Sequence, residues 1–186
     1  MALGKRLRAS RTTTRPTATI ERPLAVARET LAWIGLGANL GERVAALRSA
    51  VAGIGALPGT RVLRVSSLYR SAPVDAGGPD YLNAAAQLST TLAPQALLAA
   101  LQAIELSAGR QRPYRNAPRT LDLDIVDWAD ATIDTATLTV PHPRLWQRAF
   151  VLRPLAELVP QRVPASALQA VQTQAIERYA APGWQI

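Results

Sequence analysis

The first half of the chain alternates between segments with the apolar spacing of strands and segments with that of helices. Residues 31–36 form a short apolar run that predicts a buried strand. From Leu40 to Ile54, apolar residues recur every three or four positions, which is typical of an amphipathic helix. Residues 60–71, rich in β-branched side chains, and residues 81–92 predict two further strands, antiparallel to each other if the loop between them closes a hairpin.

Three glycines lie near the end of the first apolar run and just after it. Gly35, Gly37 and Gly41 have the spacing G-x-G-x-x-x-G. This spacing is one residue longer than the dinucleotide-binding fingerprint, and no acidic residue follows a second strand at the expected offset. We therefore interpret the glycines as a tight turn from strand to helix, with Asn39 as the helix cap.

Pro94 suits the first turn of a second helix, whose apolar positions continue to Ser107. An arginine-rich loop and a strand around residues 121–125 come next. The order strand, helix, strand, strand, helix, strand predicts an α+β fold, a ferredoxin-like sandwich with helices packed on one face of an antiparallel sheet.

The remaining residues predict shorter elements around this unit. Residues 130–139 suggest a strand pair, and residues 141–143 (Pro-His-Pro) a rigid turn. Helical segments are expected at 145–150 and 152–158, and a final amphipathic helix at 165–179 with apolar positions Leu168, Val171 and Ile176.

Composition indicates one domain with an amino-terminal extension. The 186 residues are 48% hydrophobic and include no cysteine, which excludes disulfides and thiolate chemistry. Residues 1–30 hold seven basic and two acidic groups, so they carry five of the eight net positive charges. We predict a disordered basic extension at 1–30 and a single domain at 31–186.

The amino-terminal bias toward Arg and Thr is also typical of an organelle transit peptide, and otherwise a cytoplasmic monomer is expected. No apolar run reaches the roughly 18 to 20 residues that span a bilayer. Lys5 is the only lysine, which excludes a P-loop in the predicted domain, so any phosphate chemistry there depends on arginine.

Asp122 and Asp124 are the strongest candidates for chemistry. Side chains alternate faces along a strand, so both carboxylates share one face, about 7 Å apart, while Leu121, Leu123 and Ile125 face the core. Two such carboxylates can hold one or two divalent cations.

Four arginines precede these aspartates in the segment from 110 to 124: Arg110, Arg112, Arg115 and Arg119. Magnesium binds carboxylates together with polyphosphate oxygens, and arginine matches phosphate oxygens bidentately. The segment therefore predicts a nucleoside triphosphate site. The alternative is a solvated arginine loop before a half-buried edge strand.

Six stretches in this order resemble one known family. They are IGLGANLG, SSLYRSAPV, DYLNAA, IELSAGR, RNAPRTLDLDI and TVPHPRLWQRAFVLRPL, between about Trp33 and Pro160. Together they are similar to 6-hydroxymethyl-7,8-dihydropterin pyrophosphokinase of folate biosynthesis. That family transfers the β,γ-pyrophosphoryl group of ATP to the pterin hydroxymethyl group and releases AMP.

The resemblance implies a role for each matching residue. Asp122 and Asp124 would bind two Mg²⁺ ions with ATP as co-substrate, Asp124 bridging both, and Arg110 and Arg119 would steady the transferring group. The ATP-binding positions would be Glu105, Arg110, Arg112, Arg115, Arg119, Ile125, Thr139, His142 and Arg148. His142, the only histidine, is interpreted as a hydrogen-bond donor to phosphate rather than a general base; a purely structural role is the alternative.

The pterin would be bound by Ser71, Ala72, Val74, Tyr81, Asn83 and Phe150. Tyr81 and Phe150 match the family's stacking pair, and Asn83 matches the residue that reads the ring edge. Core packing is the alternative for both aromatic residues.

This chain departs from some members of the family at three positions. Asn116 replaces a tryptophan, Pro143 an aromatic residue and Thr137 an arginine, and the loop between Arg110 and Arg119 is one residue shorter. None of these is a metal ligand, so we expect altered affinity rather than lost activity.

Two other classes of protein are less consistent with the sequence. Single-stranded RNA binding needs several exposed aromatic residues, and only 5% of this chain is aromatic, so no nucleic-acid partner is expected. A catalytically silent pterin-binding paralogue would have lost Asp122 or Asp124, and both are present.

Overall fold

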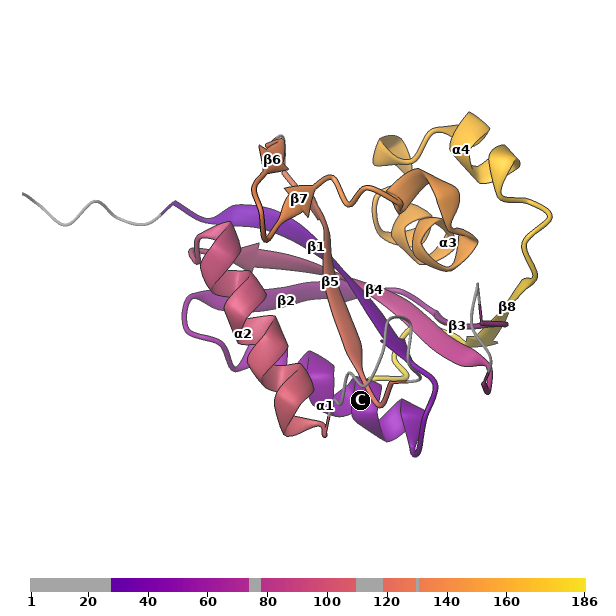
Figure 1. Cartoon of the computed structure of the whole chain (residues 1–186), viewed down its shortest axis with the longest axis horizontal. Coiled ribbons are helices and arrows are strands. Elements are labelled where there is room, and N and C mark those ends of the chain that lie inside the picture. The colour runs from indigo at the N-terminus through magenta and orange to yellow at the C-terminus, as the bar shows by residue number, and fades with distance from the viewer. Residues whose placement is uncertain (1–27, 74–77, 110–118, 130) are drawn as a thin grey trace, which may run out of the picture.

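An antiparallel sheet forms the centre of the molecule (Figure 1). The computed structural model describes residues 28–73, 78–109, 119–129 and 131–186. Its main path has the order β5 (Asp122–Trp128), β1 (Thr30–Ala38), β4 (Tyr81–Thr90), β3 (Leu68–Ser71) and β8 (Ile176–Ala180), and β2 (Thr60–Val65) also pairs with β4. All these pairs are antiparallel, which confirms the α+β, ferredoxin-like prediction.

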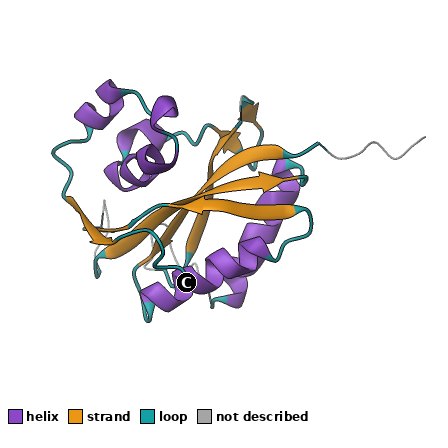
Figure 2. Cartoon of the chain, turned by 180° about the vertical axis from the view of Figure 1, so that it is seen from behind, coloured by secondary structure: helices purple, strands orange, loops and turns teal. Residues whose placement is uncertain are grey.

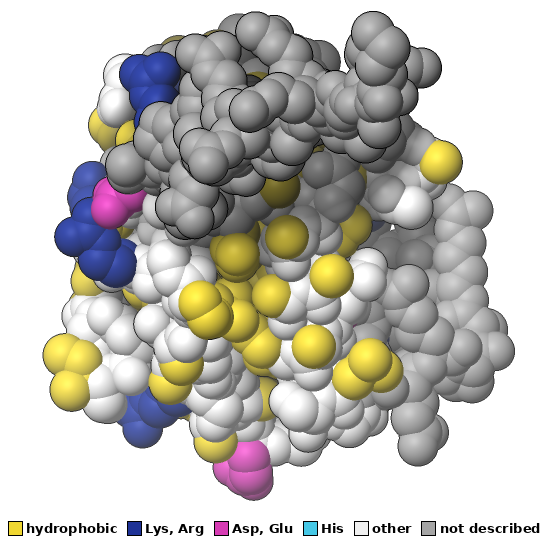
Figure 3. Space-filling model, turned by 90° about the vertical axis from the view of Figure 1, so that its left-hand side faces the viewer, with side chains coloured by type: hydrophobic (Ala, Val, Ile, Leu, Met, Phe, Trp, Pro, Cys, Tyr) yellow, Lys and Arg dark blue, Asp and Glu magenta, His cyan; other side chains and the backbone are white. Residues whose placement is uncertain are grey.

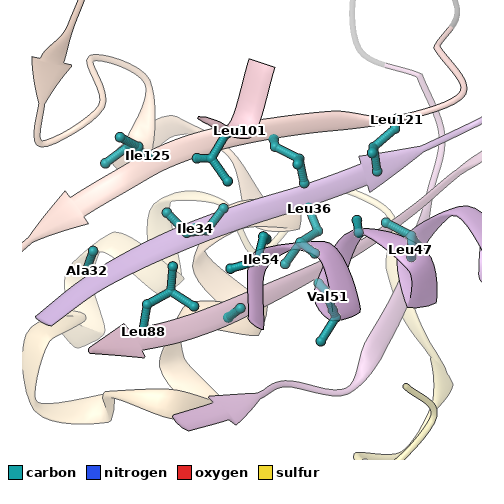
Figure 4. Close-up of a cluster of buried hydrophobic side chains, with 14 of the residues drawn as sticks. Ala32, Ile34, Leu36, Leu47, Val51, Ile54, Leu88, Leu101, Leu121 and Ile125 are labelled. Carbon is teal, nitrogen blue, oxygen red and sulfur yellow. The ribbon is translucent and has the colours of Figure 1, made fainter. Parts of the chain in front are cut away.

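One face of the sheet packs against α1 (Arg43–Gly55) and α2 (Pro94–Ser107), as predicted (Figure 4). Ala32, Ile34 and Leu36 alternate along β1 and enter this core. They meet Leu47, Val51 and Ile54 of α1 and Leu101 of α2. Alternate residues of a strand share a face, so this half of the core follows directly from the period of two in the sequence.

The opposite face carries a second, smaller core that the prediction did not include. Figure 2 shows helices on this side of the sheet, across from α1 and α2. Trp33, Ala85 and Val126 point to this face and pack with Leu152 and Leu155 of α3 (Ala149–Leu158). The sheet is therefore covered by helices on both sides, and α3 covers only part of the second side.

The interpretation of Gly35 and Gly37 as a turn is wrong, because both lie inside β1. A Cβ atom on Gly35 would lie 3.1 Å from Cγ2 of Val126, so close packing against β5 explains this glycine. The turn comes later, at Gly41, whose φ of +60° favours glycine.

Asn39 does not cap α1, whose N-cap is Glu42 without a side-chain hydrogen bond. Instead the Asn39 Oδ1 accepts from the Arg119 amide at 2.7 Å, and its Nδ2 donates to the Pro79 carbonyl at 3.3 Å. Asn39 thus joins the end of β1 to two loops that are distant in sequence.

The predicted strand at 60–71 is divided into β2 and β3 by Ser66 and Ser67. At this break the Ser66 hydroxyl accepts from the Ala85 amide, and the Ser67 amide donates to the Glu157 carboxylate. The Trp184 indole also donates to the Ser66 carbonyl at 2.8 Å. The break is therefore held by Ala85 of β4 and by contacts from the carboxyl-terminal part of the chain.

The predicted helix at 165–179 is wrong beyond its first turns. α4 covers only Ala165–Ala170, and residues 176–180 form β8, which pairs with β3. Pairing satisfies backbone groups along the edge of β3, a tertiary contact that outweighs the local apolar spacing of Leu168, Val171 and Ile176.

The short elements lie near their predicted places. The strand pair expected at 130–139 is β6 (Ile133–Asp134) with β7 (Thr139–Val140). The segment expected to be helical at 145–150 is the 3-10 turn η1 (Leu145–Gln147) followed by the start of α3, and a second 3-10 turn, η2, covers Pro160–Arg162. The predicted extension at 1–30 falls almost entirely outside the described residues.

The side of the molecule that carries α2 presents few charged side chains among those coloured in Figure 3. Glu105 is the only charged residue of α2, and it is buried. In the described ranges no helix is long and apolar enough to cross a membrane.

Candidate active site

A cavity lies on the face of the sheet that α3 covers only in part. The cavity and its open mouth take in about 910 Å³, part of which is open to solvent. Ten of the predicted site residues line it: Ser71, Ala72, Tyr81, Asn83, Arg119, Asp122, Asp124, His142, Arg148 and Phe150. They come from β3, β4, β5 and α3 and from the segments that precede β5 and α3, so the fold assembles them from distant parts of the chain.

Gly35 and Gly37 of β1 form part of the cavity floor. Gly37 pairs with Asn83 of β4 on one side and with Asp122 of β5 on the other. A Cβ atom on Gly37 would lie 3.4 Å from Oδ1 of Asn83 and 3.9 Å from Cβ of Asp122. Glycine therefore keeps the space open between a polar amide and a carboxylate.

Asp122 and Asp124 both line the cavity, while Leu121, Leu123 and Ile125 are buried in the core. The alternation predicted from the sequence is thus confirmed. The Arg119 guanidinium bonds to the Asp122 carboxylate at 2.5 Å, and both side chains are roughly one-fifth exposed, at 21% and 23%. A cation and two carboxylates consequently share one end of the cavity.

The donor set at this end fits a magnesium ion that arrives with phosphate. Both carboxylates supply oxygen, the ligand type that Mg²⁺ prefers. Among the described residues no group of three or more His, Cys, Asp or Glu side chains is placed to hold a metal. Two carboxylates plus water and polyphosphate oxygens would complete the usual octahedral shell.

His142 is held as a neutral donor. Its backbone amide donates to the Val126 carbonyl at 2.9 Å, and its Nδ1 accepts from the Arg144 amide at 3.1 Å. Burial, Arg148 and Arg144 lower the pKa of His142, against an opposing effect of Asp122. Since Nδ1 accepts, the proton of the neutral ring is on Nε2, which is then available as a hydrogen-bond donor.

Arg148 and Phe150 lie beside each other, with the guanidinium carbon 5.4 Å from the ring centroid. Burial and Arg144 lower the pKa of Arg148, and the charges of Asp124 and Asp122 act in the opposite direction. Arg148 therefore contacts an aromatic ring of the cavity and also senses the charges of both carboxylates.

The predicted pterin residues that the structure describes line the same cavity, and Asn83 and Tyr81 lie close to Asp122. Asn83 is 4% exposed, and its Nδ2 donates to the Ser71 hydroxyl at 3.0 Å. Burial raises the pKa of Tyr81, which also senses Arg119 and Asp122. A buried amide beside two aromatic rings suits a flat ligand with a polar edge.

Seven predicted residues are not among those that line the cavity. Val74, Arg110, Arg112 and Arg115 lie outside the described residues. Ile125 points into the core, and Thr139 lies on β7. Glu105 is 1% exposed, and its carboxylate accepts from the Leu123 amide at 2.8 Å, between the two aspartates of β5.

The predicted set lacked six residues that line the cavity: Gly35, Leu36, Gly37, Ala84, Val126 and Val151. The G-x-G spacing was visible, but its interpretation as a turn concealed its role. Val126 follows Asp124 by two residues, so it shares the face of Asp122 and Asp124 by the same period of two, which could have identified it.

Comparison with known proteins agrees with this geometry. The family model described as 7,8-dihydro-6-hydroxymethylpterin-pyrophosphokinase (HPPK) matches residues 33–160. Three relatives are named 2-amino-4-hydroxy-6-hydroxymethyldihydropteridine pyrophosphokinase. The Synechocystis protein is 42% identical in a match that covers 75% of this chain and 72% of that protein. The Pseudomonas aeruginosa protein is 47% identical, and the match covers 71% of this chain and 83% of that protein. The Bacillus subtilis protein is 45% identical, and the match covers 70% of this chain and 79% of that protein.

Solved structures with the same fold include HPPK-DHPS of Plasmodium falciparum. A triple mutant of that protein superposes with a TM-score of 0.59 and 14% identity, over 72% of this chain. The matched region is 40% of the longer chain, and at this identity the likeness concerns the fold alone.

Proposed function

Because the chain belongs to the 7,8-dihydro-6-hydroxymethylpterin-pyrophosphokinase family, we propose that it is the ATP-dependent pyrophosphokinase of 6-hydroxymethyl-7,8-dihydropterin in folate biosynthesis. The reaction depends on Mg²⁺ and releases AMP. One observation carries the proposal: a single cavity is lined by carboxylates and arginines and, next to them, by a buried amide and aromatic rings.

Asp122 and Asp124 would hold two Mg²⁺ ions together with the triphosphate. Bound magnesium would neutralise phosphate charge and help to align the reacting oxygens. The shared face of the two carboxylates supports this assignment, and the position of Asp124, exposed and directly in the cavity, supports its role as the bridging ligand.

The chain's own cations and donors would orient the phosphates. Arg119 and Arg148 flank the carboxylates, and the Nε2 proton of His142 is a donor to a phosphate oxygen. Phosphoryl transfer relies on alignment and charge stabilisation more than on covalent chemistry, which is what such a set of groups can supply. The resemblance adds Arg110, Arg112 and Arg115 to this end, and Glu105, Ile125 and Thr139 to the ATP site.

The pterin would lie between Tyr81 and Phe150, with its polar edge read by Asn83. The amide of Asn83 is oriented by Ser71, so its position is set before the ligand binds. Ala72 and Val74 would complete the pocket. This placement brings the hydroxymethyl group toward the carboxylate end, where the pyrophosphoryl group would be transferred. We further propose a single domain at 31–186 that acts as a cytoplasmic monomer on these two small molecules.

The test is an AMP assay with ATP, Mg²⁺ and 6-hydroxymethyl-7,8-dihydropterin. We expect AMP to form only when all three are present. Asp124→Ala should lower the rate by roughly a thousandfold or more, since metal binding contributes several kcal/mol to such transition states. Its melting temperature should stay near that of the wild type, because Asp124 is exposed.

Glu177→Ala is the matched control, since Glu177 is an exposed carboxylate on β8 that pairs with Arg70 outside the cavity. It should retain the wild-type rate. Absence of AMP with wild-type protein would overturn the enzyme assignment, and a near-normal rate in Asp124→Ala would overturn the metal assignment.

A further inference from the structure

Gln174 lies in the turn between α4 and β8, and its side-chain amide bonds to both neighbours of Arg148. Its Oε1 accepts from the Ala149 amide at 2.8 Å, and its Nε2 donates to the Gln147 carbonyl at 2.8 Å. One amide group thereby brackets a residue of the candidate active site from a segment 26 residues further along the chain.

The backbone at Arg148 explains why such a clamp is useful. Arg148 is extended, with φ of −126° and ψ of 112°, between the end of η1 and the start of α3. The first amides of a helix have no partner within the helix, and the N-cap of α3 provides no side-chain hydrogen bond. Gln174 satisfies the Ala149 amide in its place.

Gln174 and Phe150 also line a second hollow together. A small hollow next to the main cavity is lined by Ser71, Ala72, Phe150, Gln174 and Ile176. Phe150, Ser71 and Ala72 line both spaces. Gln174 therefore shares this hollow with Phe150, while its hydrogen bonds hold the backbone on either side of Arg148, including the amide of Ala149 next to Phe150.

We propose that Gln174 is a positioning residue that holds Arg148 and Phe150 in place for the two substrates. This inference rests on the proposed function, because it takes the ATP and pterin contacts of those residues from it. Gln174 lies outside the segment that matches the family model, which ends at residue 160. Its role follows from the tertiary contacts alone.

Three variants separate the hydrogen bonds from the packing. Gln174→Ala removes both, whereas Gln174→Met retains the volume without the bonds. Gln174→Glu retains an acceptor for the Ala149 amide and loses the donor to the Gln147 carbonyl. Gln172→Ala, an exposed glutamine of the same turn, is the control.

We expect Gln174→Ala and Gln174→Met to raise KM for both substrates by about tenfold, the effect of losing one or two hydrogen bonds. The turnover number should change less, because Asp122 and Asp124 lie on β5, away from the clamp. Gln174→Glu should restore KM for the pterin toward the wild-type value, since the start of α3 is still held. A purely structural role would lower stability without this split between KM and kcat.

Hydrogen exchange of the ligand-free protein provides a readout that needs no activity. Exchange of the Ala149 amide should accelerate in Gln174→Ala and Gln174→Met and stay slow in Gln174→Glu and Gln172→Ala. If the wild type forms no AMP, the proposed function fails and with it the role of Gln174 in catalysis. If the wild type is active while KM and Ala149 exchange are unchanged in Gln174→Met, only the present inference is overturned.

Discussion

The two faces of the central sheet are built from the same strands but follow different rules. On the face of α1 and α2, alternate residues of β1 and β4 are aliphatic and completely buried, such as Ile34 and Leu88. On the other face, the positions between them include Gly35, Gly37 and Asn83, and they open into a cavity. One face is optimised for packing, and the other gives up packing to leave space and polar groups for ligands.

The difference shows where stability and function are separable in this protein. Apart from Glu105 of α2, which the proposal adds to the ATP site, the first face contains no polar group that the proposed reaction uses, so changes among its aliphatic residues should affect folding. On the second face each residue has less to pack against, so changes there should affect binding more than folding.

The largest expected effect on stability comes from the packed face. Leu101→Ala removes a side chain of α2 that is 0% exposed, and we expect a loss of about 2–5 kcal/mol in the free energy of unfolding. Denaturant titration measures this loss. Activity per folded molecule, assayed well below the melting temperature, should be unchanged; a large drop in that activity would show that the faces are coupled.

A change at the open face should lower ligand affinity and leave the free energy of unfolding nearly unchanged. Gly37→Val adds a branched side chain whose Cβ starts 3.4 Å from Oδ1 of Asn83. The added side chain would occupy cavity space beside Asn83, and an overlap with the pterin that costs about 1–3 kcal/mol in binding would lower pterin affinity by roughly tenfold or more. Titration calorimetry with the pterin measures the effect. Gly55→Ala, at the exposed end of α1, is a control that should bind normally.

The smallest effect concerns the polar contacts that attach α3 to the open face. The Glu157 carboxylate accepts from the Ser67 amide at 2.7 Å and from the hydroxyl of Tyr69 at 2.5 Å, and Arg178 donates to it at 2.9 Å. Burial alone would raise the pKa of Glu157, but the hydrogen bonds from Tyr69 and Ser67 and the charge of Arg178 lower it below its ordinary value of 4.5.

A lowered carboxyl pKa stabilises the folded state at pH values above 4.5, and this contribution is lost as the pH falls through the folded pKa. Glu157→Gln should therefore show a shallower loss of stability below pH 4.5 than the wild type. Denaturation midpoints from pH 7 downward measure the slope, and Tyr69→Phe should be intermediate. Identical slopes in all three proteins would mean that these contacts do not hold α3.

The two candidate metal ligands could be predicted because both lie on one regular element, the strand β5. The alternation of Asp122 and Asp124 with Leu121, Leu123 and Ile125 is local, since a strand has a period of two whatever it packs against. The helix at Pro94–Ser107 could be predicted in the same way, because its apolar residues recur at helical spacing and form one stripe that packs against a single surface.

The errors came where local pattern and long-range contact disagree. Residues 168, 171 and 176 have the spacing of a helix, yet Ile176 belongs to a strand because β3 presents an edge for pairing. Gly35 and Gly37 of β1 have the spacing of turn residues. Glycine is needed there because Val126 and Asn83 of the neighbouring strands come close to the position that a Cβ atom would take.

The sequence by itself determined the α+β order of elements, the shared face of the two aspartates and, through its motifs, the family. Only the tertiary structure decided that Gly37 separates Asn83 from Asp122, that α3 closes part of the second face, and that Gln174 brackets Arg148. The reason is physical: periodicity reports how a residue is oriented on its own element, whereas register, edge pairing and side-chain clamps depend on elements that are distant along the chain.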